Sequence, residues 1–310
     1  MKKFIINILK FLGFIIPAYI VLLFFWSFFM PQFLAKNVRN KIAAYGHLFT
    51  RVHEIKNYKN PDILFLGSSH AYRGFDPRIF SKMGYRTFNL GSSSQSPINS
   101  KVLLNQYLKE IKPKFVVYEI CGETLETDGV ESSLDLLSNN TIDENAFEMA
   151  ISLNNIRTYN TLFYNYLRQK IGLNKFITEP KIQDGNQYIS GGYVESEYRK
   201  NPLHEEKKGK WKIIDYQIDN LKQNIAILKK NKIPFILVQT PISEKMYNAR
   251  NNNKETELLL SKMGKFKSFQ GEIKLNDTID FYDSNHLNQE AVEKFNLKFI
   301  EYLKSQNIKF

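Results

Sequence analysis

The stretch that decides the fold is Ile63-Leu64-Phe65-Leu66-Gly67-Ser68-Ser69-His70. Four consecutive apolar residues are typical of a strand that is buried on both faces. A tight turn follows them, which begins with a glycine and carries two serines. A serine at the tip of a strand and before a helix has an exposed hydroxyl and a backbone amide that can bind an anion. The stretch therefore offers a candidate nucleophile, unless Ser68 or Ser69 only caps the helix that follows.

Similar short runs, rich in β-branched and aromatic residues, recur along the chain and are bounded by glycine, proline or polar turns. The predicted strands are Asp62–Leu66, Tyr85–Leu90, Phe115–Ile120, Phe235–Gln239 and Thr278–Tyr282. Stretches with apolar residues at three- and four-residue spacing lie between most of them, and the predicted helices are Ser100–Ile111, Trp211–Lys230, Glu255–Met263 and Asn288–Ser305. Alternating strands and helices predict an α/β fold, with a mostly parallel sheet sandwiched by helices.

One segment, at about residues 124–210, breaks this alternation. It is rich in asparagine, tyrosine and charged residues, it holds a predicted helix near Glu144–Leu167, and it contains Gly191-Gly192. We interpret it as an insertion within a single domain of residues 61–310. The insertion is either a lid that shapes a substrate site or a long excursion of the chain.

The N-terminal segment predicts a membrane anchor. Residues 11–30 carry no charge, and 20 helical residues span about 30 Å, the thickness of a bilayer's hydrocarbon core. A cleaved signal peptide is the rival interpretation, but the sequence from Phe28 to Phe33 offers no small-residue cleavage site. We expect an anchor at residues 1–32, a basic stalk or packing helix at residues 33–60, and a main domain outside the cytoplasmic membrane.

The charge distribution argues against a nucleic-acid partner. The net charge is +12, but residues 1–60 carry nine Lys or Arg against one acid, so residues 61–310 carry 34 bases and 30 acids. An excess of charge that borders a hydrophobic segment is typical of a chain lying against anionic lipid. The single cysteine, Cys121, excludes an intramolecular disulfide and a metal site built from several cysteines.

A second candidate element follows the last predicted strand, where the sequence reads Asp283-Ser284-Asn285-His286. An aspartate three residues before a histidine can hold one imidazole nitrogen while the other takes a proton from a serine. The carboxyl ends of parallel strands meet at one edge of a sheet, so the first and last strand ends can bring the serine turn and this pair together. The loop Asn89-Leu90-Gly91, after the second strand, has amides that could face a developing oxyanion.

The chain resembles the SGNH, or GDSL-type, hydrolase superfamily in the order of its sequence motifs. The resemblance rests on the early Gly67-Ser68-Ser69 turn, the Asn89-Leu90-Gly91 loop and the late Asp283-x-x-His286, and it covers about residues 61–125 and 230–310. In style it is closest to the membrane-anchored envelope members, such as the DltD-like and alginate-acetylation proteins. The resemblance implies a three-layer sandwich with a flavodoxin-like strand order.

The resemblance also implies roles for individual residues. Ser69 matches the nucleophile, His286 the general base and Asp283 the residue that orients it, while the amides of Ser69 and Gly91 match oxyanion donors. The third motif departs from the pattern, because Glu119-Ile120-Cys121-Gly122-Glu123 supplies no oxyanion asparagine. The candidates for a further donor, a substrate contact or a supporting position are His70, Asn89, Gln95 and Glu119. No cofactor is expected, and no metal, because no metal-ligand spacing is present.

These features predict a membrane-anchored serine esterase or O-acyltransferase. By the resemblance, its substrate is an acyl ester on a cell-envelope glycan or polymer, and its acyl group comes from a membrane-bound acyltransferase partner. The alternative is an envelope assembly or glycan-binding protein that keeps this fold with a decayed site. The missing asparagine favours the alternative, whereas the intact serine, aspartate and histidine count against it.

Overall fold

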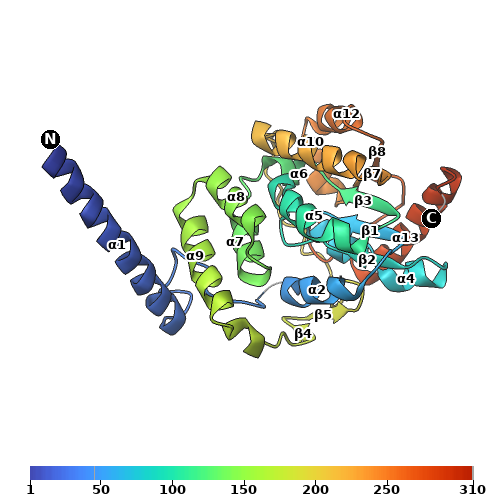
Figure 1. The fold of residues 1–310 in the computed structure, drawn as a ribbon. Helices are drawn as coiled ribbons and strands as arrows, with labels where there is room; N and C mark the ends of the chain where they lie inside the picture. Colours follow the sequence, from blue (N-terminus) through green and yellow to red (C-terminus); the bar gives the residue numbers. More distant parts are fainter. Residues whose placement is uncertain (45, 309–310) are drawn as a thin grey trace.

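The computed structural model describes residues 1–44 and 46–308, and its centre is a parallel sheet (Figure 1). The sheet has five strands in the order β2-β1-β3-β7-β8, and each neighbouring pair is parallel. The strands are β1 (Ile63–Leu66), β2 (Thr87–Asn89), β3 (Phe115–Glu119), β7 (Phe235–Gln239) and β8 (Phe266–Ser268). This is the 2-1-3-4-5 order of flavodoxin-like sheets.

Alternate residues of each strand fill two separate cores. Ile63 and Phe65 point to one face, where they pack with α4 (Pro77–Lys82) and α13 (Gln289–Ser305). Leu64 and Leu66 point to the other face, towards α5 (Pro97–Ile111) and α10 (Asp215–Lys230). Because both faces are covered, the apolar run of β1 is buried throughout. The predicted α/β fold with its sandwiched parallel sheet is confirmed.

Four of the predicted strands lie within a few residues of their predicted bounds, but the fifth is wrong. Thr278–Tyr282 is not a strand, because the side chain of Asn276 accepts hydrogen bonds from the N–H groups of Thr278 and Ile279 and folds the backbone into a turn. The fifth strand is instead β8, three residues that no sequence pattern had marked.

Shorter helices complete the body outside the insertion. They are α2 (Leu48–Glu54), η1 (Ile55–Asn57), α3 (Ser69–Gly74), α11 (Glu244–Asn248) and α12 (Asn253–Ser261).

The insertion folds into helices followed by a small antiparallel sheet of order β4-β5-β6. Its elements are α6 (Gly122–Glu126), α7 (Val130–Asn139), α8 (Glu144–Leu153), α9 (Ile156–Lys170), η2 (Leu173–Phe176), β4 (Ile182–Gln183), β5 (Asn186–Ile189) and β6 (Tyr193–Ser196). The helix predicted near Glu144–Leu167 is two helices, because Asn154 ends α8 with a left-handed backbone and Asn155 caps the start of α9.

The turn between β5 and β6 is fastened to the end of β2. The N–H of Asn89 donates to the carbonyl oxygen of Gly191 at 2.8 Å. Gly192 has a φ of +85°, and a Cβ there would lie 2.1 Å from the carbonyl oxygen of Asn89. Only glycine allows this approach, so the small sheet sits against the main sheet at a fixed place.

Helix α1 (Lys2–Phe29) is, among the described residues, one helix long and apolar enough to cross a membrane, a property that a signal sequence shares. Figure 1 shows it extending away from the body, with its C-terminal end beside α9. The hydroxyl of Tyr19 donates to Asn160 Oδ1 at 2.9 Å, and the rings of Phe24 and Tyr164 lie 5.7 Å apart.

Between α1 and the main sheet, α2 carries a fully buried arginine. Arg51 donates from Nε to the carbonyl oxygen of Gly192 at 2.8 Å and from Nη1 to that of Gly91 at 3.0 Å. Its guanidinium carbon lies 4.5 Å from the ring centre of Tyr72. One side chain in residues 33–60 therefore joins the insertion to the loop after β2. The division of the chain into anchor, stalk and domain stays a prediction.

Arg51→Ala should destabilise the fold, because it leaves two buried carbonyl groups without their donor and opens a cavity. We expect the free energy of unfolding to fall by about 3 kcal/mol. Urea unfolding of the full chain in a neutral detergent measures this change. Lys56→Ala removes an exposed cation from the same segment and should leave stability unchanged; equal losses in the two variants would contradict the prediction.

Candidate active site

The candidate nucleophile stands where β1 passes into α3. Ser69 is the first residue of α3, and Ser68 caps the helix by accepting from the N–H of His70 at 3.2 Å. The cap is thus Ser68, which leaves the hydroxyl of Ser69 for other partners. Gly67 has a φ of +145°, and a Cβ there would lie 2.7 Å from Glu119. The turn passes so close to β3 that glycine is needed.

The structure brings Ser69, His286 and Asp283 into one hydrogen-bonded chain. His286 Nε2 lies 2.7 Å from Ser69 Oγ, and His286 Nδ1 lies 2.9 Å from Asp283 Oδ2. The two segments are 217 residues apart in the sequence. The chain links a hydroxyl, an imidazole and a carboxylate in the order that serine-based acyl transfer uses.

Asp283 also shapes the loop that presents the histidine. Its Oδ1 accepts from the backbone N–H groups of Asn285 at 3.0 Å and His286 at 2.8 Å. The N–H of Tyr282 donates to the carbonyl oxygen of His286 at 2.8 Å, which closes the loop just before α13. The spacing of three residues therefore lets one carboxylate hold both the backbone and the ring of His286.

Burial and charge set the protonation of this pair. Burial lowers the pKa of His286 below its ordinary value and outweighs the opposing effect of Asp283. For Asp283, burial acts to raise the pKa, but the hydrogen bond and charge of His286 outweigh it and bring the pKa below its usual range. Near neutral pH the site therefore holds a neutral imidazole beside a carboxylate, the form that can accept a proton.

A buried carboxylate supports the serine turn from behind. Glu119, at the end of β3, accepts from the N–H of Ser68 at 2.9 Å and from its hydroxyl at 2.8 Å. Glu119 Oε1 lies 3.6 Å from His70 Nδ1. Burial alone would lower the pKa of His70, but Cys121 and Glu119 raise it well above its ordinary value. The Glu119 carboxylate therefore favours the protonated form of His70 beside Ser69.

The loop after β2 is held together by its own side chains. Asn89 donates from Nδ2 to the carbonyl oxygen of Ala71 at 2.6 Å and accepts from the N–H of Gly91 at 3.0 Å. Gln95 bonds Ser92 and Ser100, each at 2.9 Å. Asn89 and Gln95 therefore organise the loop and do not line the pocket beside Ser69. The N–H of Gly91 already has a partner, which an oxyanion would have to displace.

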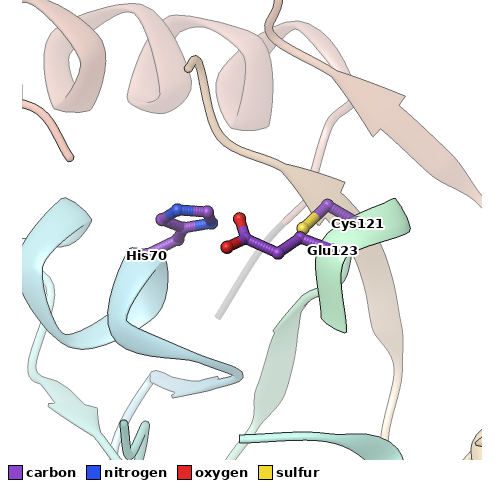
Figure 2. Close-up of side chains that lie close together, drawn as sticks. All are labelled: His70, Cys121 and Glu123. Carbon is purple, nitrogen blue, oxygen red and sulfur yellow. The ribbon is translucent and has the colours of Figure 1, made fainter. Parts of the chain in front are cut away.

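Three side chains near Ser69 form a set that could hold a metal ion. Donor atoms of His70, Cys121 and Glu123 lie within 4.8 Å of one another. Figure 2 shows the Glu123 carboxylate pointing towards His70, with Cys121 beside Glu123. Burial raises the pKa of the Cys121 thiol, so the thiol is protonated near neutral pH, and a metal would have to displace that proton. The sequence-based expectation of no metal stays a prediction.

Ser69 and His70 open into a pocket of about 630 Å³. Thr124, Glu126 and Asn285 line it, together with basic residues of the insertion and the segment after it that sequence reasoning did not single out. The available signal was the dense run Lys207-Lys208-Gly209-Lys210-Trp211-Lys212. The run shows no periodicity, so nothing in the sequence indicated which other elements it would lie against.

Glu119→Gln should lower the pKa of His70, because it removes a charge that stabilises the imidazolium. NMR titration of ring-labelled histidine in the full chain measures the pKa. Glu126→Gln removes a carboxylate that lines the same pocket but is not among the groups that shift His70, so it should leave the value unchanged. A His70 that titrates identically in the parent and in Glu119→Gln would refute this account of the turn.

Comparison with known proteins gives only distant likenesses. No protein-family model matches the chain, and no curated protein matches it in sequence. Among solved structures, a candidate acylhydrolase from Bacteroides fragilis is similar with a TM-score of 0.40 and 13% identity, over 83% of this chain and 97% of that one. A GDSL-like lipase from Bacteroides thetaiotaomicron has a TM-score of 0.39 and 13% identity, over 83% and 98%. A Streptococcus pneumoniae protein described as a candidate platelet activating factor has a TM-score of 0.42 and 10% identity, over 83% and 94%.

Proposed function

We propose that the chain is a serine esterase or O-acyltransferase with Ser69 as its nucleophile. The observation that carries the proposal is the 2.7 Å contact between Ser69 Oγ and His286 Nε2, with Asp283 on the other ring nitrogen. A serine hydroxyl is a weak nucleophile unless an adjacent base takes its proton. The side chain of His286 is 16% exposed, so it is largely shielded from bulk water.

In the first half of the reaction, Ser69 Oγ attacks the carbonyl carbon of an ester while His286 Nε2 takes the hydroxyl proton. Asp283 stabilises the imidazolium that forms. The tetrahedral intermediate collapses, the proton passes from His286 to the departing alcohol oxygen, and an acyl-serine remains. In the second half, His286 takes a proton from water or from an acceptor hydroxyl, whose oxygen attacks the acyl carbon. The bond between that carbon and Ser69 Oγ then breaks, and the proton passes from His286 to Ser69 Oγ. Water gives hydrolysis, and a sugar hydroxyl gives transfer.

The oxyanion of the intermediate needs hydrogen-bond donors close to the position that the former carbonyl oxygen takes. Within residues 1–44 and 46–308, the N–H of Ser69 donates no hydrogen bond, as expected for the first residue of a helix. His70 Nε2 is buried and has no hydrogen-bond partner in the described part of the chain, and the His70 ring lies 5.2 Å from that of His286. We propose these two as the oxyanion donors in place of the asparagine that the third motif lacks. The N–H of Gly91 could donate to the oxyanion only after releasing its present acceptor, Asn89 Oδ1.

The finer assignments follow from the sequence motifs. We propose that the chain belongs to the SGNH superfamily and to its membrane-anchored envelope members, with α1 as the anchor and the α/β body outside the cytoplasmic membrane. The acyl ester would then be carried by a cell-envelope glycan or polymer, with a membrane-bound acyltransferase as the source of acyl groups.

Ser69→Ala should abolish covalent labelling of the full chain by a fluorophosphonate, because this reagent reacts with a base-activated serine. Labelling and hydrolysis of 4-nitrophenyl acetate, both in a neutral detergent, provide the test. Ser94→Ala is the matched control, since Ser94 lines the same pocket but does not contact His286.

A parent that folds but neither labels nor hydrolyses the ester would overturn the enzymatic proposal. The binding-protein alternative would then gain support, and the bonded N–H of Gly91 already favours it.

The pH dependence gives a second test. Because the pKa of His286 lies below the ordinary value of about 6.5, the acid limb of kcat/KM should have its midpoint below that pH. Asp283→Asn removes a charge that raises this pKa, so the midpoint should move lower while the rate falls by about 10⁴-fold. Rates of 4-nitrophenyl acetate hydrolysis between pH 4 and 8 give kcat/KM and its midpoint, and Asp184→Asn, on the exposed β4–β5 turn, is the control. A midpoint that rises in Asp283→Asn would rule out this account.

A further inference from the structure

The pocket beside Ser69 has a wall of basic side chains. Five cations line it: Lys207, Lys208, Lys210, Lys212 and Arg250. Two acids, Glu123 and Glu126, stand among them. Outside the N-terminal 60 residues the chain is nearly balanced in charge, so this concentration is local.

The wall is built on fixed backbone. The N–H of Gly209 donates to the carbonyl oxygen of Ala249 at 2.9 Å, and the N–H of Asn251 donates to that of Gly209 at 3.0 Å. Trp211 is buried, and its ring nitrogen donates to Asn253 Oδ1 at 2.7 Å. We call residues 207–212 the basic strap. Because the strap is anchored at its middle and near its end, its lysines are held over the pocket.

The acids of the pocket are already engaged. Glu126 accepts from the backbone N–H of Lys212 at 3.0 Å and lies 3.9 Å from Arg250. Glu123 accepts from Asn285 Nδ2 at 3.2 Å. The four strap lysines are exposed, and no acid among the described residues pairs with their ammonium groups. The pocket therefore keeps a positive excess, to which the protonated form of His70 adds.

An uncompensated cluster of like charges raises the free energy of the folded chain unless a ligand of opposite charge neutralises it. The strap lysines and Arg250 line the same pocket as Ser69. A concave wall of one charge sign concentrates oppositely charged substrate at the site.

We propose that the basic strap and Arg250 bind an anionic segment of the substrate, a carboxylate or phosphate group on the polymer that carries the ester. This inference rests on the proposed function, because the pocket is taken as a substrate site on the ground that Ser69 lines it. The guanidinium carbon of Arg250 lies 4.2 Å from the ring centre of Trp211, a contact that restrains this side chain beside the pocket, and a guanidinium can bind a carboxylate or phosphate through two donors.

Binding can be measured without turnover. The probes are an oligogalacturonate for carboxylate, a short polyphosphate for phosphate and a xylo-oligosaccharide as the neutral comparison, each with the same uncharged dye. Fluorescence anisotropy with the full chain in a neutral detergent gives Kd at low and high salt. We expect at least one anionic probe to bind at least tenfold more tightly than the neutral one, and the preference to shrink as salt screens the charges.

The triple variant Lys208→Gln, Lys210→Gln, Lys212→Gln should weaken binding of that anionic probe by about tenfold or more. The matched control, Lys229→Gln, Lys230→Gln, Lys232→Gln, removes the same charge from exposed positions just before β7, at the opposite edge of the sheet, and should change Kd by less than twofold. Which anionic probe binds identifies carboxylate or phosphate as the recognised group.

Equal losses in the two triple variants, or equal affinity for the neutral and anionic probes, would overturn the inference. So would lysine-dependent binding that appears only with phosphatidylglycerol vesicles, because the lysines would then contact lipid. A parent that hydrolyses 4-nitrophenyl acetate but binds no anion refutes this inference alone. A parent that binds anions through the strap but does not react at Ser69 refutes the proposed function alone.

Discussion

The candidate site depends on one buried carboxylate. Glu119 is 1% exposed, and an unpaired charge at such a position would cost several kcal/mol. Two donors of Ser68 and the protonated form of nearby His70 compensate it. The same contacts fix the turn that presents Ser69, and Gly67 is required because the turn passes so close to β3. Removing this carboxylate would therefore disturb the charge of His70 and the position of the serine together.

Much of the fold could be predicted because the arrangement of the strands in the sheet follows from the alternation of strand and helix patterns along the sequence. The apolar run of β1 and the helices between strands fix a parallel sheet, and a parallel sheet brings strand ends to one edge. Ser69 follows β1 as predicted, whereas Asp283 and His286 follow a turn instead of the predicted strand, and His286 nevertheless contacts both Ser69 and Asp283. Their catalytic roles stay predictions, since proximity allows the chemistry without demonstrating it.

The errors have a common physical origin in side chains that bond their own backbone. Asn276 replaces a predicted strand by a turn, and Asn155 caps the start of α9 and so divides a predicted helix. An asparagine can satisfy a backbone donor in many loop geometries, and periodicity does not reveal which one it adopts. The sequence marks Glu119 as a candidate for a substrate contact or a supporting position, and only the structure shows the burial and the contacts with Ser68 that distinguish the two.

The docking of α1 on α9 has a consequence for a chain anchored as proposed. Tyr19 and Phe24 contact α9 within the apolar helix itself, and Asn40 donates to the carbonyl oxygens of Ser27 and Met30 at its end. A body held in this way is not joined to α1 by a flexible linker, so it would not sample a wide range of positions above the bilayer. As a nucleophile, Ser69 would then work at one height and in one direction, and its effective concentration would be high only for polymers that pass through that narrow zone. The length of the substrate, and not the motion of the enzyme, would then set how far from the membrane the reaction reaches.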